Sequence, residues 1–554
     1  MREKEADLTT IWRQYQKGCD YLSQQNIYEQ TDENYRMYEG DQWYGLESGS
    51  ERLPIYNIIA PIIKYKVAMV AQNGMTIHYS SMNDRDPNMH AELMKVCEQL
   101  NKYASSTWER LKLDKISWDV ITNACIAGND YLYFYQDGDG LKMEQIDNTN
   151  IHFSNEQERD IQKQKYILIA SRRFVSEIRA AAAQNGVKKE DLDLIQPDND
   201  TEHQAGDSAK TEVQGDDGKC ISVLKMWKQD GCVHISRSVR NLIYQKDTRI
   251  DGMKLYPLVS MMWEQKKGAA RSDGAVRFLI PNQLEINKGL ARMALSVKKT
   301  AYPTLAVKTD AIENPAALDT IGATIEVSGQ SVQDLDDIIK YIQPAQMGNA
   351  ANNLMQDMIT TTRDLAGAGD AVTGQINPEK ASGAAIIAVR DAAALPLNAP
   401  IAGYRQFVED IALVWYDMWT AYNPNGMEIV VDDTPVTIPA EVLQEMKIDV
   451  RVDVSATNPY SKYAQEQTLE NLMTQQLISF DEYVEALDDD AAAPKGKLLD
   501  ILQKRKLQQQ NQMTQMQQIA EQLAQENGTL KAQLGVPQQT GGGMIDRQPE
   551  IQGI

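Results

Sequence analysis

The feature that most constrains the fold of this chain is a pair of helical segments that flank a short segment of mixed strand and helix. The stretch SDGAVRFLIPNQLEINKGL, from residue 272, has apolar residues at helical spacing, and residues 346–366 are helical again. The residues between them predict three strands (302–309, 323–329 and 337–343) and a short helical piece (315–322). Because this insert is short, we expect the two helices to run antiparallel beside each other, with the insert at one end. Pro281 either starts the first helix or kinks it.

A glycine-rich loop follows the second helix. DLAGAGDAVTGQINPEKASGAAI, at 364–386, interrupts a strongly helical region. The loop shares glycines with phosphate-binding loops, but it lacks their GK[ST] ending and follows a helix instead of a strand. A nucleotide site is therefore not indicated. The loop is either a plain connection between helices or a segment that a function requires. A long helix is expected from about 379 to 422, bent near Pro396 and Pro400.

The remaining segments combine helices with antiparallel strands. Apolar periodicity and turn residues predict the following elements: helices at 8–40, ended by Gly40, at 56–72 and, as a pair, at 88–127; hairpins at 131–146 and 221–239, the second turning at Asp230 and Gly231; strands at 166–174, 427–431 and 447–455; and helix at 461–507. Residues 196–219 are polar and predict a disordered insertion. The glutamine-rich stretch at 508–534 is either a self-associating coiled coil or a frayed helix. The fold class is α+β, mainly α.

Charge and motifs exclude several functions. A net charge of −22 disfavours general wrapping of nucleic acid, which needs clustered Lys and Arg. The five cysteines are widely spaced, with no metal-binding pair, so reduced thiols in an aqueous cytoplasm are expected. No apolar run is long enough for a membrane span, and no membrane association is expected. No nucleophile, base and oxyanion donor can be assembled, so we expect no catalytic residues, no metal and no cofactor.

Four stretches together resemble the portal proteins of tailed bacteriophages. YEGDQW followed by YNIIAPIIKYKVAMVAQNGMTI resembles the start of the portal wing, and RSDGAVRFLIPNQLEINKGLARMALSVKKTAYPTL resembles the first stem helix running into the clip. DLAGAGDAVTGQINPEKASGAAIIAV resembles the tunnel-loop region, and KIDVRVDVSATNP resembles the wing strand before the crown. Each motif alone is weak, and their serial order carries the resemblance.

The resemblance implies an organisation for the whole chain. It assigns these segments: wing at 1–270, containing the insertion 196–219; first stem helix at 271–300; clip at 301–345; second stem helix at 346–366; tunnel loop at 367–380; long kinked helix at 381–422; wing strands at 423–457; crown at 458–510; and a glutamine-rich helical and disordered tail at 511–554.

The resemblance also implies a function without catalysis. The chain would form a ring, usually of twelve subunits, at one vertex of the capsid, with a channel for double-stranded DNA during packaging and ejection. Implied partners are the terminase large subunit, a head–tail adaptor protein, and the major capsid and scaffolding proteins. The chain would reside in the virion, and in the host cytoplasm during assembly.

Under this interpretation the tunnel loop faces the DNA. Its glycines permit backbone reversals, its short polar residues suit contact with a moving polyanion, and its one lysine can touch phosphates. The predicted DNA-facing residues are Gly367, Gly369, Asp370, Thr373, Gly374, Gln375, Asn377 and Lys380. Two alternatives remain open: another oligomeric head–tail structural protein of a phage, or a nucleic-acid enzyme whose site no motif reveals.

Overall fold

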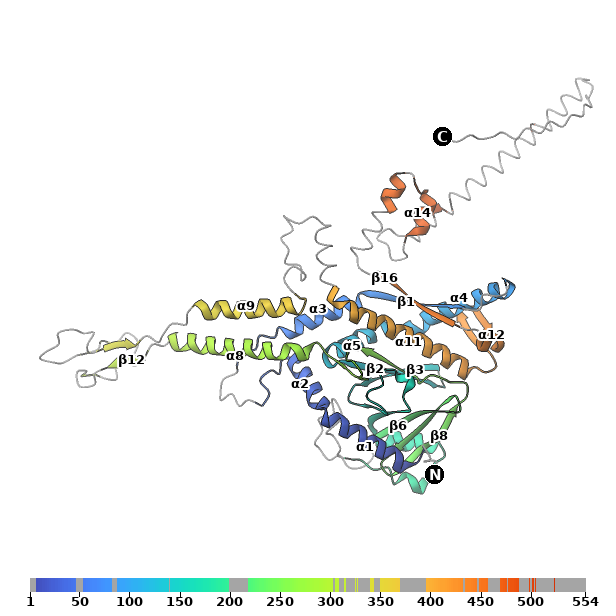
Figure 1. The fold of residues 1–554 in the computed structure, drawn as a ribbon, viewed down its shortest axis with the longest axis horizontal. Helices are drawn as coiled ribbons and strands as arrows, with labels where there is room; N and C mark the ends of the chain where they lie inside the picture. The colour runs from blue at the N-terminus through green and yellow to red at the C-terminus, as the bar shows by residue number, and fades with distance from the viewer. Residues whose placement is uncertain are drawn as a thin grey trace, which may run out of the picture. The chain divides into compact units, whose positions relative to one another are not determined.

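The structure is a computed structural model, and the chain divides into two compact units, Met1–Ser455 and Ala456–Ile554. It describes residues 6–45, 53–81, 87–138, 140–198, 218–301, 304–307, 313–314, 324, 326, 339–342, 349–368, 395–431, 434–445, 448–456, 469–475, 477–487, 498, 501–502, 504 and 523. Helices and strands are both abundant in this part of the chain, as an α+β fold requires (Figure 1).

The two largest sheets of the first unit are both antiparallel. The larger has the order β4-β5-β6-β7-β8, and the smaller has the order β3-β2-β9. Their bounds are β2 (Asn129–Asp137), β3 (Gly140–Asp147), β4 (Ile151–Phe153), β5 (Tyr166–Phe174), β6 (Lys219–Gln229), β7 (Cys232–Val239), β8 (Leu242–Ile250) and β9 (Leu258–Met262). The predicted turn between β6 and β7 is confirmed, because Asp230 and Gly231 both have positive φ, as a type I′ hairpin turn needs.

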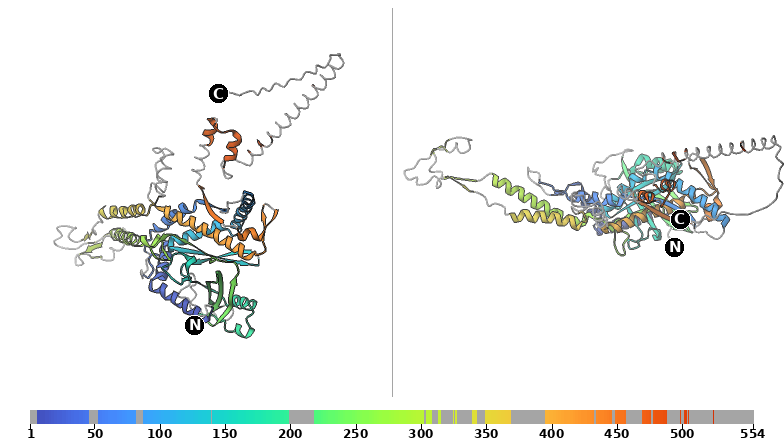
Figure 2. Two further views of the ribbon diagram at one scale, coloured as in Figure 1. Left: turned by 45° about the vertical axis from the view of Figure 1, so that its right-hand side comes forward. Right: turned by 90° about the horizontal axis from the view of Figure 1, so that it is seen from above.

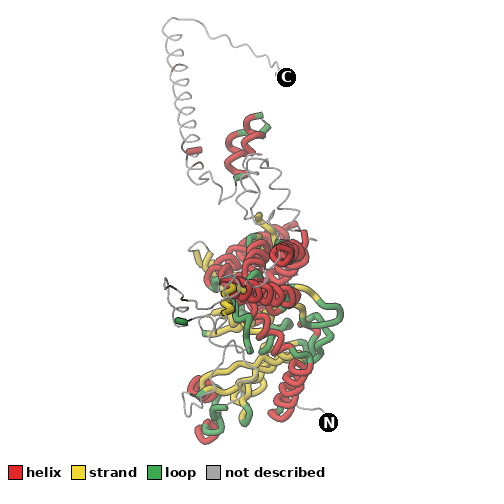
Figure 3. The backbone as a smooth tube through the Cα atoms, turned by 90° about the vertical axis from the view of Figure 1, so that its left-hand side faces the viewer, coloured by secondary structure: helices red, strands yellow, loops and turns green. Residues whose placement is uncertain are grey.

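The predicted N-terminal helices are also confirmed. They are α1 (Leu8–Gln24), α2 (Ile27–Glu39), α3 (Ile59–Ala71), α4 (Pro87–Arg110) and α5 (Leu113–Ala127). Gly40 ends α2 in the left-handed conformation, as the sequence predicted, although the expected single helix over 8–40 is broken at Asn26. In Figure 3 most helices of this unit gather on one side of its strands, and others flank the strands of the opposite end.

One large apolar core joins the helices α2, α3, α4 and α5 and strands of both larger sheets to α11 (Asn398–Tyr422), whereas Ile11 and Tyr15 of α1 belong to a smaller cluster. Trp263 and Trp415 are its largest fully buried side chains, and Phe134 packs edge-on against Trp415. All five cysteines are free, as their spacing predicted, and all are buried. None of the helices that the structure describes is long and apolar enough to cross a lipid bilayer.

Several elements depart from the sequence prediction. Strand β1 (Asn73–Ser81) was not predicted, and it pairs with the predicted β16 (Ile448–Ala456) from the far end of the unit. Also unpredicted are β4, β8 and β9 of the two larger sheets, and the following elements: α6 (Val175–Gln184), α7 (Lys189–Leu192), β10 (Glu264–Gln265), β11 (Ser272–Asp273), β15 (Thr434–Ile438) and α12 (Ala440–Glu445). Strand β15 pairs with the predicted β14 (Met427–Val431).

The predicted insertion at 196–219 begins too early. Asp198 accepts hydrogen bonds from Arg172 Nη1 (3.0 Å) and from the Ile221 amide (2.8 Å), which ties this residue to β5 and β6. Lys219 already belongs to β6. Residues 199–217 lie outside the described residues.

The expected helix–insert–helix arrangement begins with α8 (Val276–Ala301) and returns with α9 (Asn349–Leu365). Pro281 lies inside α8, so it does not start the helix. Of the insert, the first and last expected strands are present as β12 (Thr304–Val307) and β13 (Ile339–Ile342), and the two pair antiparallel. The expected helical piece at 315–322 and most of the middle strand lie outside the described residues.

The long helix expected from about 379 needs correction where the structure describes it. A 3-10 turn, η5 (Leu395–Leu397), contains Pro396, and α11 begins at Asn398. Pro400 therefore lies in the first turn of α11, where proline is tolerated, and not at a bend inside a helix. Residues 379–394 lie outside the described part.

In the second unit the expected helix at 461–507 is interrupted. A helical stretch covers residues 469–474, and α14 (Phe480–Ala486) starts anew. Ser479 forms a capping box with Glu482: the Ser479 hydroxyl accepts from the Glu482 amide, and the Glu482 carboxylate accepts from the Ser479 amide. This cap explains the separate start. Most of the glutamine-rich stretch and the tail lie outside the described residues.

Candidate functional site

Helices α8 and α9 form an antiparallel pair, called here the helix pair (Figures 1 and 2). Asn282 Nδ2 donates to Thr362 Oγ1 at 3.2 Å, and Gly289 lies against the Met355 side chain. From the first of these contacts to the second, the residue number rises by seven along α8 and falls by seven along α9, so the two helices run antiparallel. The seam between the helices is apolar, with buried Ile286 and Met355 at its centre.

Two buried amides tie α8 to the chain before α3. Gln283 Oε1 accepts from the Ile58 amide (2.9 Å), and Gln283 Nε2 donates to the Tyr56 carbonyl (2.7 Å). Asn287 Oδ1 accepts from the Tyr56 amide (3.0 Å), and Asn287 Nδ2 donates to Gln42 Oε1. We call Gln283 and Asn287 the amide clamp. Both side chains are fully buried, so their hydrogen bonds satisfy backbone groups that would otherwise lack partners.

The segment at 271–275, just before α8, is called here the root segment. It lies unusually close to the end of α5. A Cβ added at Gly274 would lie 2.1 Å from the Ile126 carbonyl oxygen, and one added at Gly128 would lie 2.1 Å from the Ser272 carbonyl oxygen. Ser272 Oγ also donates to the Gly128 carbonyl at 2.6 Å. Only glycine fits at these two crossing points, which fixes where α8 begins.

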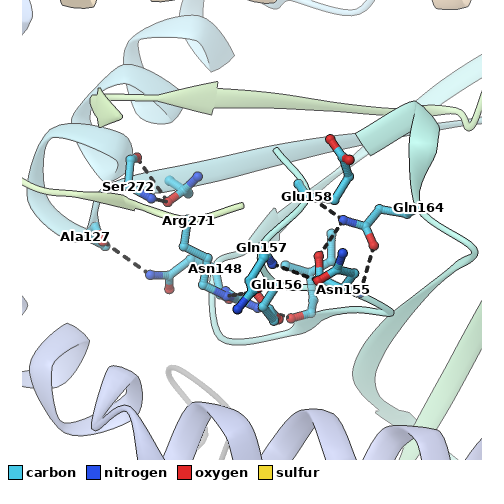
Figure 4. A network of polar contacts seen from close by, with 11 residues as sticks. Ala127, Asn148, Asn155, Glu156, Gln157, Glu158, Gln164, Arg271 and Ser272 are labelled. Carbon is cyan, nitrogen blue, oxygen red and sulfur yellow. Dashed lines mark hydrogen bonds and ion pairs between the residues drawn. The ribbon is translucent and has the colours of Figure 1, made fainter. Parts of the chain in front are cut away.

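Arg271 holds the root segment from the other side (Figure 4). Its guanidinium donates to both carboxylate oxygens of Glu156 (3.0 and 3.2 Å) and to the backbone carbonyls of Asn148 and Ile151. Both charged side chains are about nine-tenths buried, with exposures of 9% and 10%. This bidentate ion pair connects α8 to the loops beside β4.

Two cavities adjoin these features. One of about 50 Å³ lies beside the root segment and includes Gln30, Asn34 and Arg271 in its lining. The other, of about 220 Å³, lies between the chain at Tyr56 and the end of α9 at Arg363. Both are smaller than typical small-molecule sites, which span roughly 300–1,000 Å³. Among the described residues, no group of three or more His, Cys, Asp or Glu side chains is arranged to hold a metal ion.

Only the first predicted DNA-facing residue lies in the described part. Gly367 follows α9 with φ +71°, and the Ala368 amide donates back to the Arg363 carbonyl at 2.9 Å. This is a Schellman end, in which glycine takes the left-handed position. Gly369, Asp370, Thr373, Gly374, Gln375, Asn377 and Lys380 lie outside the described residues.

The amide clamp and the root segment were not singled out from the sequence. Polar residues at Gln283 and Asn287 suggest an exposed helix face, although their spacing of four residues places them on one side of α8. The stretch RSDG at 271–274 gives no signal of the root segment by itself. Its role becomes visible only from the contacts of Arg271 and Gly274.

The comparisons with known proteins identify this arrangement. A family model described as the phage P22-like portal protein matches residues 236–540, more than half of the 554 residues. It covers the root segment, the helix pair, the insert and α11. A search of curated proteins gave no match.

The chain therefore belongs to the phage P22-like portal protein family, as the four sequence stretches predicted. Portal proteins are structural, and the family places this chain in an oligomeric ring at a capsid vertex.

Proposed function

We propose that twelve copies of this chain form the ring, and that its channel passes double-stranded DNA during packaging and ejection. The helix–insert–helix arrangement carries this proposal: the antiparallel helix pair starts at a root fixed by Gly274 and Arg271, and the insert is joined to its far end. Helix pairs placed side by side around an axis would enclose a channel. A net charge of −22 favours sliding of DNA over tight binding.

The symmetry of the purified protein tests the ring. Class averages from negative-stain electron microscopy should show rings of about twelve subunits with a central hole of duplex width. If only monomers form, co-expression with the major capsid and scaffolding proteins is the next step. A discrete dimer that persists in that co-expression would overturn the proposal.

The loop at 367–380 is proposed to face the DNA in the channel. The Schellman end at Gly367 supports this, because it turns the chain away from α9 immediately before the short polar residues. Replacement of residues 370–377 by a Gly-Ser segment of equal length should leave ring assembly intact and reduce the packaged or retained DNA. A matched control replaces the exposed Asp137 and Gly138, at the end of β2, by the same residue types. Normal packaging and retention in the loop variant would refute this role.

The insert at 301–345 is proposed to contact the terminase large subunit during packaging and a head–tail adaptor protein afterwards. The β12–β13 pairing supports a separate knob, since Thr304 lies opposite Ile342 and the chain leaves and returns at one place. Substitutions in the insert should weaken the binding of both proteins to assembled rings in a co-sedimentation assay. Unchanged binding of both would contradict the proposal.

A further inference from the structure

Two carboxyl side chains lie opposite each other at the end of the β2–β3 hairpin. Asp130 and Asp147 form the last pair of the antiparallel ladder, away from the turn. Directly opposite residues share one face of a sheet, with Cβ atoms roughly 4.5–5.5 Å apart. Asp130 has only 1% of its surface exposed, and Asp147 is half-buried. Because like charges placed directly opposite destabilise a strand pair, two ionised carboxylates would push these strand ends apart.

The hydrogen bonds of Asp130 are unevenly distributed between its two oxygens. Asn123 Nδ2 of α5 and Gln145 Nε2 of β3 both donate to Asp130 Oδ2. Asp130 Oδ1 is buried and has no hydrogen-bond partner in the described part of the chain. A protonated carboxyl oxygen is a donor, and the carboxylate of Asp147 opposite is an acceptor. A proton on Oδ1 would therefore give this oxygen a partner.

The surroundings of the pair favour the protonated form. Burial raises the pKa of the Asp130 carboxyl well above its ordinary value, and the charge of Asp147 raises it further, against the effect of the two amides. Burial also raises the pKa of the Asp147 carboxyl. Tyr35 of α2 stays a neutral phenol, because burial and the charges of Asp130, Asp147 and Glu39 raise its pKa. On the other side of β2, the partner of Asp130 in β9 is the apolar Met261.

Asn129 and Asn148 are the chain neighbours of the two carboxyls, and both hold the root segment. Asn129 Oδ1 accepts from the Ser272 amide at 2.6 Å and from the Ser272 hydroxyl at 3.1 Å. The backbone carbonyl of Asn148 accepts from the Arg271 guanidinium. Separation of the two carboxyls would therefore move two supports of the root segment at once.

We propose that Asp130 and Asp147 share one bound proton, carried on Asp130 Oδ1 and directed at the Asp147 carboxylate, and that this proton keeps the root segment in place. Loss of the proton leaves two like charges across one rung of the ladder. A carboxyl whose native pKa is raised contributes stability that is fully present below the pKa of the unfolded chain, about 4, and is lost as the pH rises through the native value. The pair thus makes the attachment of α8 sensitive to pH.

Hydrogen exchange followed by mass spectrometry tests this coupling in the full-length chain. Exchange of the peptide that contains Ser272 is compared between the unmodified protein and Asp130→Asn, at about pH 5.5 and about pH 7.5. The asparagine amide can donate to Asp147 as the protonated carboxyl does, but it cannot ionise. The exchange rate of the unmodified protein, divided by that of Asp130→Asn, should rise about tenfold per pH unit, because opening releases one proton. A ratio that does not change with pH would overturn the proposal.

Asp137→Asn is the matched control, because Asp137 is an exposed carboxyl at the far end of the same strand. The corresponding ratio for this variant should stay constant between the two pH values. An equal pH-dependent rise in the control would also overturn the proposal, since the effect would then not belong to the buried pair.

Two further measurements identify what neutralises the pair, even if Asp130→Asn fails to fold. Infrared spectra of the unmodified protein with isotopically labelled aspartate should show the carbonyl band of a protonated carboxyl above pH 7, where Asp410, with a pKa of about 6, is mostly ionised. Absence of that band would overturn the proposal. Mg²⁺ or Ca²⁺ should leave the exchange of the Ser272 peptide unchanged. If these ions slow that exchange and a chelator reverses the effect, a metal ion neutralises the carboxyls and the proposal fails.

Discussion

The ion pair between Arg271 and Glu156 offers a quantitative test of how α8 is anchored. In Arg271→Met the hydrophobic volume is largely kept, but Glu156, with 10% of its side chain exposed, loses its cation. The carbonyls of Asn148 and Ile151 lose their donors as well. Breaking a buried pair from one side costs about 3–5 kcal/mol. Water can enter the adjoining cavity of about 50 Å³ and hydrate the carbonyls, so we expect about 4 kcal/mol in total.

Urea unfolding followed by tryptophan fluorescence measures this cost. With an m value of about 3–4 kcal/mol per molar, the midpoint should fall by about 1 M. All variants are compared at one protein concentration, because ring assembly makes the midpoint concentration-dependent. Lys102→Met is the matched control: it removes an exposed ion pair within α4, between Lys102 and Glu98 at 3.7 Å, which is worth only about 0.3–0.5 kcal/mol.

A double variant separates the lost pair from general disruption. Glu156→Gln added to Arg271→Met removes the uncompensated carboxylate, so part of the stability, about 1–3 kcal/mol, should return. A midpoint for Arg271→Met within about 0.2 M of the unmodified protein would refute the reasoning, because it would mean that Glu156 is neither buried nor dependent on this cation.

Three further predictions concern the root segment, the amide clamp and α11. Gly274→Ala should destabilise by at least about 1–3 kcal/mol, because its Cβ would overlap the backbone, whereas Gly138→Ala meets no atom within 4 Å and should be neutral in the same unfolding assay. Gln283→Leu should expose the Tyr56 segment, and hydrogen exchange would detect faster exchange of amides before α3; unchanged exchange would contradict the clamp. Burial, aided by nearby carboxylates, raises the pKa of the Asp410 carboxyl to about 6. The stability that the protonated carboxyl contributes is therefore fully present below about pH 4 and is lost as the pH rises through 6. Relative to the unmodified protein, the free energy of unfolding of Asp410→Asn should therefore be higher at pH 7.5 than at pH 4. An equal difference between the two proteins at both pH values would contradict this.

The sequence predicted the elements whose signals are local. Gly40 and the turn at Asp230 and Gly231 are specified by the backbone conformations that these residues adopt readily, and the amphipathic spacing of α8 and α9 is visible over several turns. Their antiparallel packing follows from the short insert. The family resemblance was also readable, since it depends on the order of motifs along the chain.

Non-local contacts could not be predicted in this way. Strand β1 finds its partner β16 more than three hundred residues later, and no local pattern specifies that pairing. The amide clamp breaks the rule that polar helix positions face solvent, because Gln283 and Asn287 are buried against backbone groups of a distant segment. The root segment depends on the close crossing of Gly128 and Gly274, which only three-dimensional contacts reveal.

The strand pair β12–β13 has a consequence for how this protein can change. Thr304 and Ile342 face each other, so the residues between the two strands form an excursion whose ends are held together by the ladder. The length and sequence of that excursion can then vary without altering the register of α8 and α9, which is set by their own seam at Gly289 and Met355. The excursion is thus an exchangeable cassette, which can be replaced while the body of the subunit stays the same.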